Sequence, residues 1–170
     1  PQRNAALTAK QAADVDVLSG GRLDFGIGVG WMSDEFAALG MSFERRGARS
    51  DDYIRMMQTI WQSHESSYEG EFVKLPAAYQ YPKPAQKPHP PLYFGGESKF
   101  ALRRVARFGH WFGVNVMPEG VPAKMAMLEK QCDLEGRDVN DVKIALCPYA
   151  NACDRDTLRL AQIALGSVGG

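Results

Sequence analysis

Apolar residues along the first third of the chain recur at helical or strand-like spacing. Residues 7–18 carry a broad apolar face, which predicts a helix packed on a sheet. A short apolar run bounded by glycines at 23–29 predicts a strand, and Ser33 is expected to cap a short helix that ends at Leu39. Residues 48–62 keep the strongest helical rhythm. These apolar positions are Tyr53, Met56, Met57, Ile60 and Trp61.

The rest of the chain also alternates segments with strand-like and helical patterns. Residues 67–75 place a glycine between polar residues and predict a hairpin, and the proline-rich stretch 76–91 is expected to be extended. The rest predicts strands at 92–94, 111–116 and 143–147 and helices at 98–108, 121–134 and 156–165. Apolar strands alternating with helices predict an α/β fold whose parallel sheet is buried on both faces. An open doubly wound sheet and a (β/α)8 barrel both fit, although a barrel needs eight strands and about four are recognised.

The amino-acid composition limits which binding partners and which cellular compartment are expected. The 170 residues are 45% hydrophobic, and 20 basic residues balance 20 acidic ones. This suits a single domain over residues 1–170, and the absence of a charge surplus argues against nucleic acid or anionic membrane as partners. No apolar run reaches the roughly 18–20 residues of a membrane span. Three cysteines and three histidines without metal-type spacing favour reduced thiols, a cytoplasmic protein and no metal site.

The glycine-rich run GIGVGW at residues 26–31 invites comparison with nucleotide-binding loops. A dinucleotide fingerprint requires glycines spaced G-x-G-x-x-G, and the third glycine is missing from either start: Trp31 occupies its position counted from Gly26, and Ser33 counted from Gly28. No Gly-Lys-Ser/Thr follows, so a P-loop is excluded as well. The remaining interpretation is that these glycines let the end of a strand and its neighbours approach closely.

A better candidate for binding an anion is Gly95-Gly96-Glu97-Ser98. This stretch joins the carboxyl end of one expected strand to the amino end of an expected helix. Backbone N–H groups and the helix dipole would meet a phosphate there, and Ser98 adds a hydroxyl. A tight turn in which Ser98 is only a helix N-cap explains the same residues equally well, so both interpretations stay open.

Charged residues cluster around the strongest helix and the hairpin. Pairs of carboxylates can serve general acid–base chemistry, but these lie on an expected polar helix face and a turn. We therefore expect them to be solvated surface charges. They are Arg45, Arg46, Arg49, Asp51, Asp52, Glu69 and Glu71.

Several short motifs occur in a recognisable order. They are Arg3-Asn4, Ala9-Lys10-Gln11, Leu18-Ser19-Gly20-Gly21-Arg22, Gly26 to Trp31, Glu35-Phe36, Glu44-Arg45 and Pro90-Pro91-Leu92-Tyr93-Phe94-Gly95-Gly96. Together they resemble the luciferase-like monooxygenase family, in particular its branch that uses the deazaflavin coenzyme F420. The similarity is good over residues 1–116 and weaker beyond. It implies a TIM barrel of which this chain supplies strands four to seven, with an inserted hairpin and proline-rich loop at about 67–91, as a piece of a longer chain.

The resemblance also implies a binding site for a flavin-type ring. It places Gly95, Gly96, Glu97 and Ser98 around the cofactor phosphate, Arg3 and Asn4 near the ring, and Gly28, Val29, Gly30 and Trp31 at the cofactor and substrate pocket. No catalytic residue is carried over, because Trp31 stands where sugar-phosphate-oxidising relatives have a glutamate acid. Val29 stands where luciferases have an arginine that grips the flavin phosphate, which weakens the case for FMN.

The expected function is therefore hydride transfer between F420 and a small organic substrate. One alternative is a two-component monooxygenase that takes reduced FMN from a separate reductase and activates oxygen. Another is a non-catalytic flavin-binding or structural fragment. The resemblance further implies a homodimer, for which the 7–18 helix is the candidate interface, and it leaves the substrate undetermined.

Overall fold

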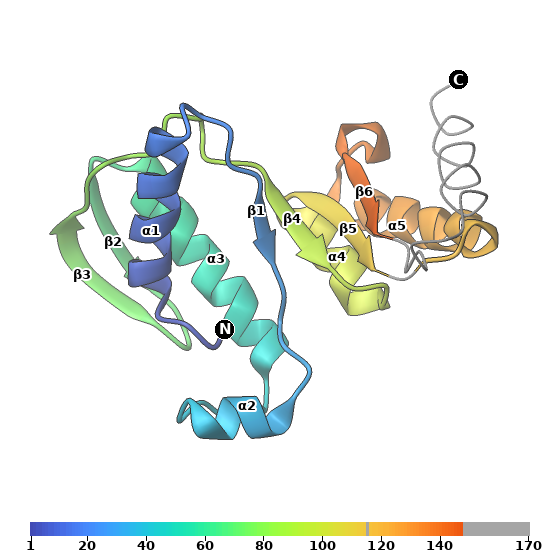
Figure 1. The fold of residues 1–170 in the computed structure, drawn as a ribbon, viewed down its shortest axis with the longest axis horizontal. Coiled ribbons are helices and arrows are strands. Elements are labelled where there is room, and N and C mark those ends of the chain that lie inside the picture. Colours follow the sequence, from blue (N-terminus) through green and yellow to red (C-terminus); the bar gives the residue numbers. More distant parts are fainter. Residues whose placement is uncertain (115, 148–170) are drawn as a thin grey trace. The chain divides into compact units, whose positions relative to one another are not determined.

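The computed structural model describes residues 1–114 and 116–147. The helix expected at 156–165 lies outside these residues. The chain divides into two compact units (Figure 1). The first contains Pro1–Phe25 and Val29–Pro91, and the second contains Gly26–Gly28 and the chain from Leu92 onward.

Two helices form the centre of the first unit (Figure 1). Helix α1 spans Ala5–Leu18 and helix α3 spans Arg46–Gln62, so both predicted helices are confirmed with slightly earlier starts. The buried face of α1 consists largely of alanines, which lets α3 approach closely. The indole of Trp61 is buried at this contact and its Nε1 donates to the carbonyl of Ala9 at 2.9 Å. The short helix α2, Ser33–Ala38, also forms, but Met32 rather than Ser33 is its N-cap residue.

A two-stranded hairpin completes this unit and confirms the predicted one. Strand β2, Glu65–Glu69, pairs antiparallel with β3, Lys74–Tyr79. The pairing shifts by one residue between Ser66 and Tyr68, so β3 carries an extra residue in a bulge that includes Pro76. Because a bulge leaves a residue out of the ladder, the missing N–H of proline is tolerated there. The proline-rich stretch predicted from residue 76 is extended at its start, where β3 continues to Tyr79 and pairs with β2.

The turn of the hairpin is anchored to α3 by Asp52. Its carboxylate accepts hydrogen bonds from the Tyr68 hydroxyl at 2.6 Å and from the Phe72 N–H at 2.7 Å. Burial and the bond to Asp52 raise the pKa of Tyr68 to about 12, so this phenol stays protonated and donates at ordinary pH. A Cβ on Gly70 would lie 2.1 Å from the carboxylate, which explains a glycine at the turn.

The expectation that all the clustered charges are solvated was wrong for Asp52 and Arg49, which are both buried. Arg49 donates to the carbonyls of Ser42 and Glu44 at 2.6 and 3.1 Å. The physical reason is that the hairpin and the loop before α3 both fold back over this helix. These two segments cover positions of α3 that helical periodicity assigns to solvent.

The second unit is built on a four-stranded sheet in the order β1-β4-β5-β6. Its strands are β1 Phe25–Ile27, β4 Leu92–Gly95, β5 His110–Val114 and β6 Ile144–Cys147. The β4–β5 and β5–β6 pairs are parallel, as predicted. The strand expected at 23–29 is shorter, and the one expected at 111–116 ends at Val114.

Two helices follow β4 and β5 and cover one face of this sheet. Helix α4, Lys99–Phe108, packs on β4, β5 and helix α5, Val121–Glu135 (Figure 1). Short 3-10 turns at Pro118–Gly120 and Val139–Asp141 precede α5 and β6. Phe94 and Trp111 are buried, whereas Phe112 and Val114, on alternate positions, are each 38% exposed. The sequence predicted a sheet buried on both faces. Among the described residues, only the face that carries Phe94 and Trp111 is buried.

Candidate functional site

The loop after β4 leads directly into the amino end of α4. Gly96 has φ +112°, a backbone conformation that favours glycine. Ser98 is the N-cap of α4, and its Oγ accepts a hydrogen bond from the Ala101 N–H at 3.2 Å. The N-cap interpretation of Ser98 is thereby confirmed. It leaves the hydroxyl hydrogen able to donate to a ligand, so the cap and an anion contact are compatible.

The first turn of α4 keeps backbone donors that the helix does not use. The first bond along the helix runs from the Leu102 N–H to the Ser98 carbonyl at 3.0 Å, and the Ala101 N–H is taken by the cap. The N–H groups of Lys99 and Phe100 therefore have no acceptor within the helix. Together with the positive end of the helix dipole, they suit a phosphate or another anion.

Two glycines end neighbouring strands beside this loop. Gly28 directly follows β1, and Gly95 is the last residue of β4, its neighbour in the sheet. Apart from each glycine and its two chain neighbours, no heavy atom of the described residues lies within 4 Å of the place that a Cβ would take at either position. The backbone at both strand ends is therefore open to close approach by a flat ring. Both strand ends belong to the same unit as the amino end of α4.

Two further contacts hold the loop, and both come from segments that the sequence analysis did not assign to the site. The Glu97 carboxylate accepts from the Val114 N–H at 2.8 Å, and the Glu97 carbonyl accepts from Lys124 Nζ at 3.1 Å. Lys124 lies in the first turns of α5. Its only sequence signal is a basic residue near the start of the helix that follows the next strand.

The remaining residues predicted for the site belong to the first unit. Arg3 is exposed, and Asn4 is the N-cap of α1, where its Oδ1 accepts from the Leu7 N–H at 3.0 Å. Val29 is half-buried, and Trp31 is 80% exposed. The structure thus places Gly28 and residues 95–98 in the second unit and the other five residues in the first unit.

Gly30 has a structural reason to be glycine. Its φ is +78°, and a Cβ there would lie 2.6 Å from the Phe36 ring. Its carbonyl accepts from Arg46 Nε at 3.0 Å, and the Arg46 guanidinium lies 3.9 Å from the centre of the Phe43 ring. Arg46 is thus half-buried and bonded rather than the solvated surface charge that was expected.

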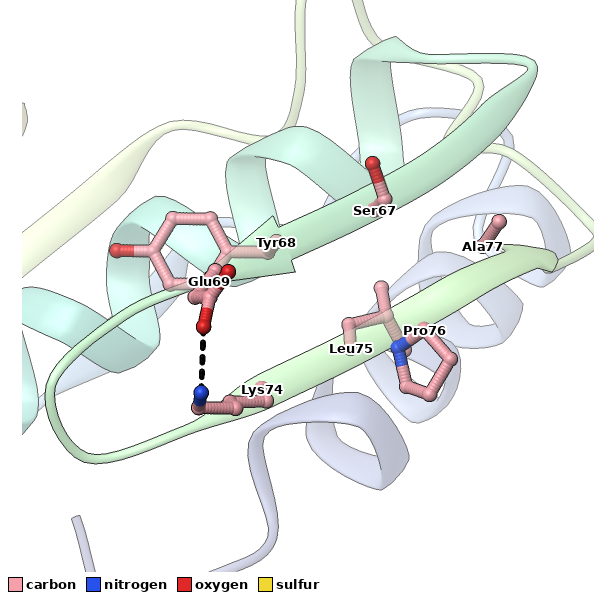
Figure 2. A pocket seen from close by; sticks show the side chains of 7 residues that line it. All are labelled: Ser67, Tyr68, Glu69, Lys74, Leu75, Pro76 and Ala77. Carbon is pink, nitrogen blue, oxygen red and sulfur yellow. Dashed lines mark hydrogen bonds and ion pairs between the residues drawn. The ribbon is translucent and has the colours of Figure 1, made fainter.

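A hollow of about 370 Å³ lies on the hairpin of the first unit. Figure 2 shows its lining from both strands, with an ion pair between Glu69 and Lys74. Both charged side chains are more than two-thirds exposed, so the pair contributes little stability and activates neither group. None of the predicted cofactor residues lines this hollow, and we assign it no chemistry. Its lining residues are Ser67, Tyr68, Glu69, Lys74, Leu75, Pro76 and Ala77.

Residues 1–114 and 116–147 contain neither a candidate metal site nor a candidate membrane-spanning helix. No group of three or more His, Cys, Asp and Glu side chains there could hold a metal ion. No helix in this part of the chain has the length and apolar character needed to cross a membrane.

Comparison with known families identifies the chain's relatives. The model of the luciferase-like monooxygenase family matches residues 1–162. The chain belongs to this family. The resemblance drawn from the ordered motifs is thereby confirmed, and members of the family are oxidoreductases.

One relative matches almost the whole chain. The FMNH(2)-dependent dimethylsulfone monooxygenase of Pseudomonas putida is 32% identical over 167 residues. The match covers 96% of this chain and 45% of the relative. The chain therefore spans about half the length of the curated relatives it matches.

Solved structures support the fold. Monooxygenase RslO1 from Streptomyces bottropensis superposes with a TM-score of 0.74 at 22% identity, over 97% of this chain and 54% of that one. An F420-dependent secondary alcohol dehydrogenase in complex with an F420-acetone adduct also gives 0.74, at 23% identity, over 84% of this chain and 44% of that one. The predicted fold class, an α/β fold of the luciferase-like barrel type represented by part of the barrel, is confirmed.

Proposed function

We propose that this chain carries the phosphate-binding part of a flavin-type cofactor site in an oxidoreductase. The observation that carries the proposal is the loop at residues 95–98. It presents the amino end of α4 beside the open backbone of Gly28 and Gly95. Ligands of parallel α/β folds bind at the carboxyl ends of the strands, where this loop lies.

Reduced FMN is the first candidate cofactor. The relative that matches 96% of the chain at 32% identity depends on FMNH(2) by name. The arginine that luciferases use for the flavin phosphate is replaced by Val29, so the phosphate must be held elsewhere. The α4 terminus, with Lys124 next to the loop, offers that alternative.

Coenzyme F420 is the second candidate, as the motif order in the sequence indicates. F420 also carries a phosphate that suits the amino end of a helix. When bound, reduced FMN would supply oxygen activation and F420 would supply hydride transfer. The chain's own residues would act by binding: the Ser98 hydroxyl and the N–H groups of the loop hold the phosphate, and Gly28 and Gly95 admit the ring. Arg3, Asn4, Val29, Gly30 and Trp31 remain proposed contacts to the ring and substrate.

A direct titration separates the candidates. Reduced FMN and F420 are each added to the chain without oxygen, and binding is followed by absorbance and by quenching of F420 fluorescence. We expect saturable binding of one of them, and oxygen-dependent consumption of FMNH2 if FMN is the cofactor. A folded chain that binds neither would instead indicate a non-catalytic fragment.

The partners follow from the cofactor and from one exposed face. A reduced-FMN enzyme needs a separate reductase as well as a small organic substrate.

A homodimer is proposed through the outer face of α1, where Leu7, Val15 and Leu18 are 57%, 49% and 86% exposed while its alanines face inward. Exposed apolar side chains aligned on one helix are typical of an interface. Light scattering on the purified chain tests for the dimer.

The Ser98→Ala variant is expected to bind the cofactor about fivefold more weakly, because one hydroxyl hydrogen bond contributes about 1 kcal/mol. The same change removes the α4 cap, so the free energy of unfolding should fall by about 1 kcal/mol. Ser98→Thr keeps a hydroxyl and serves as the control, with both quantities close to wild type. Unchanged affinity in Ser98→Ala would reject the assignment of the phosphate to this loop.

A further inference from the structure

Three hydrogen bonds from outside fix the conformation of the loop after β4. Trp111 Nε1 donates to the Gly96 carbonyl at 3.1 Å, and Lys124 Nζ donates to the Glu97 carbonyl at 3.1 Å. The third bond runs from the Val114 N–H to the Glu97 carboxylate at 2.8 Å. Two of the three end on Glu97, which is thus tied to β5 by its side chain and to α5 by its main chain.

These bonds determine where the loop's own donors point. The peptide bonds on either side of Glu97 are trans, and in a planar trans peptide the N–H is directed opposite to the preceding carbonyl. Because the carbonyls of Gly96 and Glu97 are turned toward Trp111 and Lys124, the N–H groups of Glu97 and Ser98 are turned away from them. With the N–H groups of Lys99 and Phe100, which have no acceptor within α4, they form one set of backbone donors.

We propose that Glu97 is a positioning residue of this anion-binding loop and is not itself a cofactor ligand. A carboxylate that faced a phosphate would repel it, whereas the Glu97 carboxylate is engaged by the end of β5. Its bonds to β5 and α5 hold the two adjacent peptides in the orientation that presents their N–H groups. The inference rests on the proposed function and concerns the same site.

Two substitutions of Glu97 separate positioning from direct contact. Glu97→Gln removes the charge but keeps a carbonyl oxygen that can accept from the Val114 N–H. Glu97→Ala removes the acceptor. Dissociation constants for reduced FMN and for F420 are measured for both variants, together with Tm and the amide exchange rate at Val114. Glu129→Ala, on an exposed position of α5 in the same unit, is the control for the loss of a negative charge.

A positioning role predicts a specific pattern. Glu97→Ala should weaken binding about fivefold or more and speed exchange at Val114, because the bond that orders the loop is lost. Glu97→Gln should bind within about twofold of wild type, since its amide oxygen replaces the acceptor. Both variants should stay folded at the temperature of the binding measurement, and Glu129→Ala should match wild type in affinity.

Each other pattern overturns the proposal. Tighter binding by both variants would mean that the carboxylate faces the phosphate, and weaker binding by both would make Glu97 a direct ligand. A lower Tm with unchanged affinity would leave Glu97 only a structural role. If wild-type protein bound neither cofactor, the proposed function would fail, and unchanged exchange at Val114 in Glu97→Ala would separately refute the tether.

Discussion

Replacing Gly109 with alanine is expected to lower the free energy of unfolding by about 3 kcal/mol. A Cβ at this position would lie 2.2 Å from the carbonyl oxygen of Leu92 and 3.1 Å from its carbonyl carbon. The φ of Gly109 is 177°, which any residue adopts, so the cost is steric. Leu92 begins β4 and residue 110 begins β5, and neither backbone can move without disturbing the parallel pairing of the two strands.

The matched control is Gly120→Ala in the same unit. The nearest atom to a Cβ there is a side-chain carbon of Val116 at 3.9 Å, an ordinary contact, and φ is −84°. Its free energy of unfolding should remain within about 0.5 kcal/mol of wild type. Urea unfolding of the three proteins makes the comparison. Equal stability of Gly109→Ala and Gly120→Ala would contradict the close approach of residue 109 to β4.

The Asp16→Asn variant is expected to be less stable than wild type by about 2–3 kcal/mol near neutral pH. Asp16 is fully buried, and its carboxylate accepts from the Gln86 N–H at 2.9 Å and from Gln86 Nε2 at 2.8 Å. These bonds tie the end of α1 to the loop before β4. An asparagine would direct its own amide hydrogens at one of the two donors, leaving a buried hydrogen-bonding group without a partner.

The pH dependence follows from the pKa of Asp16. Burial raises this pKa, but the hydrogen bonds from Gln86 outweigh it and leave the folded pKa below the ordinary value of 3.8. A lowered folded pKa means that the carboxylate stabilises the protein above about pH 4. That contribution is lost as the pH falls through the folded value. The stability gap between wild type and Asp16→Asn should therefore be full at pH 6–7 and shrink below pH 4.

Urea unfolding at a series of pH values measures this gap. Asp14→Asn is the control, because Asp14 lies two residues away on the same helix but is 40% exposed in its ion pair with Lys10. Its effect should stay below about 1 kcal/mol. A gap for Asp16→Asn that does not change between pH 7 and pH 3 would show that the carboxylate charge contributes nothing.

Local patterns predicted most of the elements. Helical rhythm identified α1, α3, α4 and α5, and a helix cap was one of the two interpretations of Ser98, because the cap bond spans only three residues. The hairpin was recognised from a glycine between polar residues. Ser33 shows the limit of such signals, because a serine next to two acidic residues fits both the cap and the first helical position, and Met32 occupies the cap.

Buried charges could not be predicted in the same way. Asp52 and Arg49 lie on a helix face that the sequence pattern assigns to solvent, and the hairpin and the 42–44 segment cover it only after folding. For Asp16, the partner is Gln86, seventy residues further along the chain. No local pattern reports such a partner, because the burial that makes a charge stabilising comes from segments that return from elsewhere.

The sequence by itself determined the α/β alternation, the family and the position of the loop that we propose to bind a phosphate, because each depends on residues close together in the chain. The tertiary structure alone decided how that loop is held. Glu97 meets Val114 and Lys124, 17 and 27 residues away, only because β5 and α5 pack beside the end of β4. Orientation of the peptide N–H groups is a property of those contacts, and contacts between distant segments arise only when the sheet and its helices assemble.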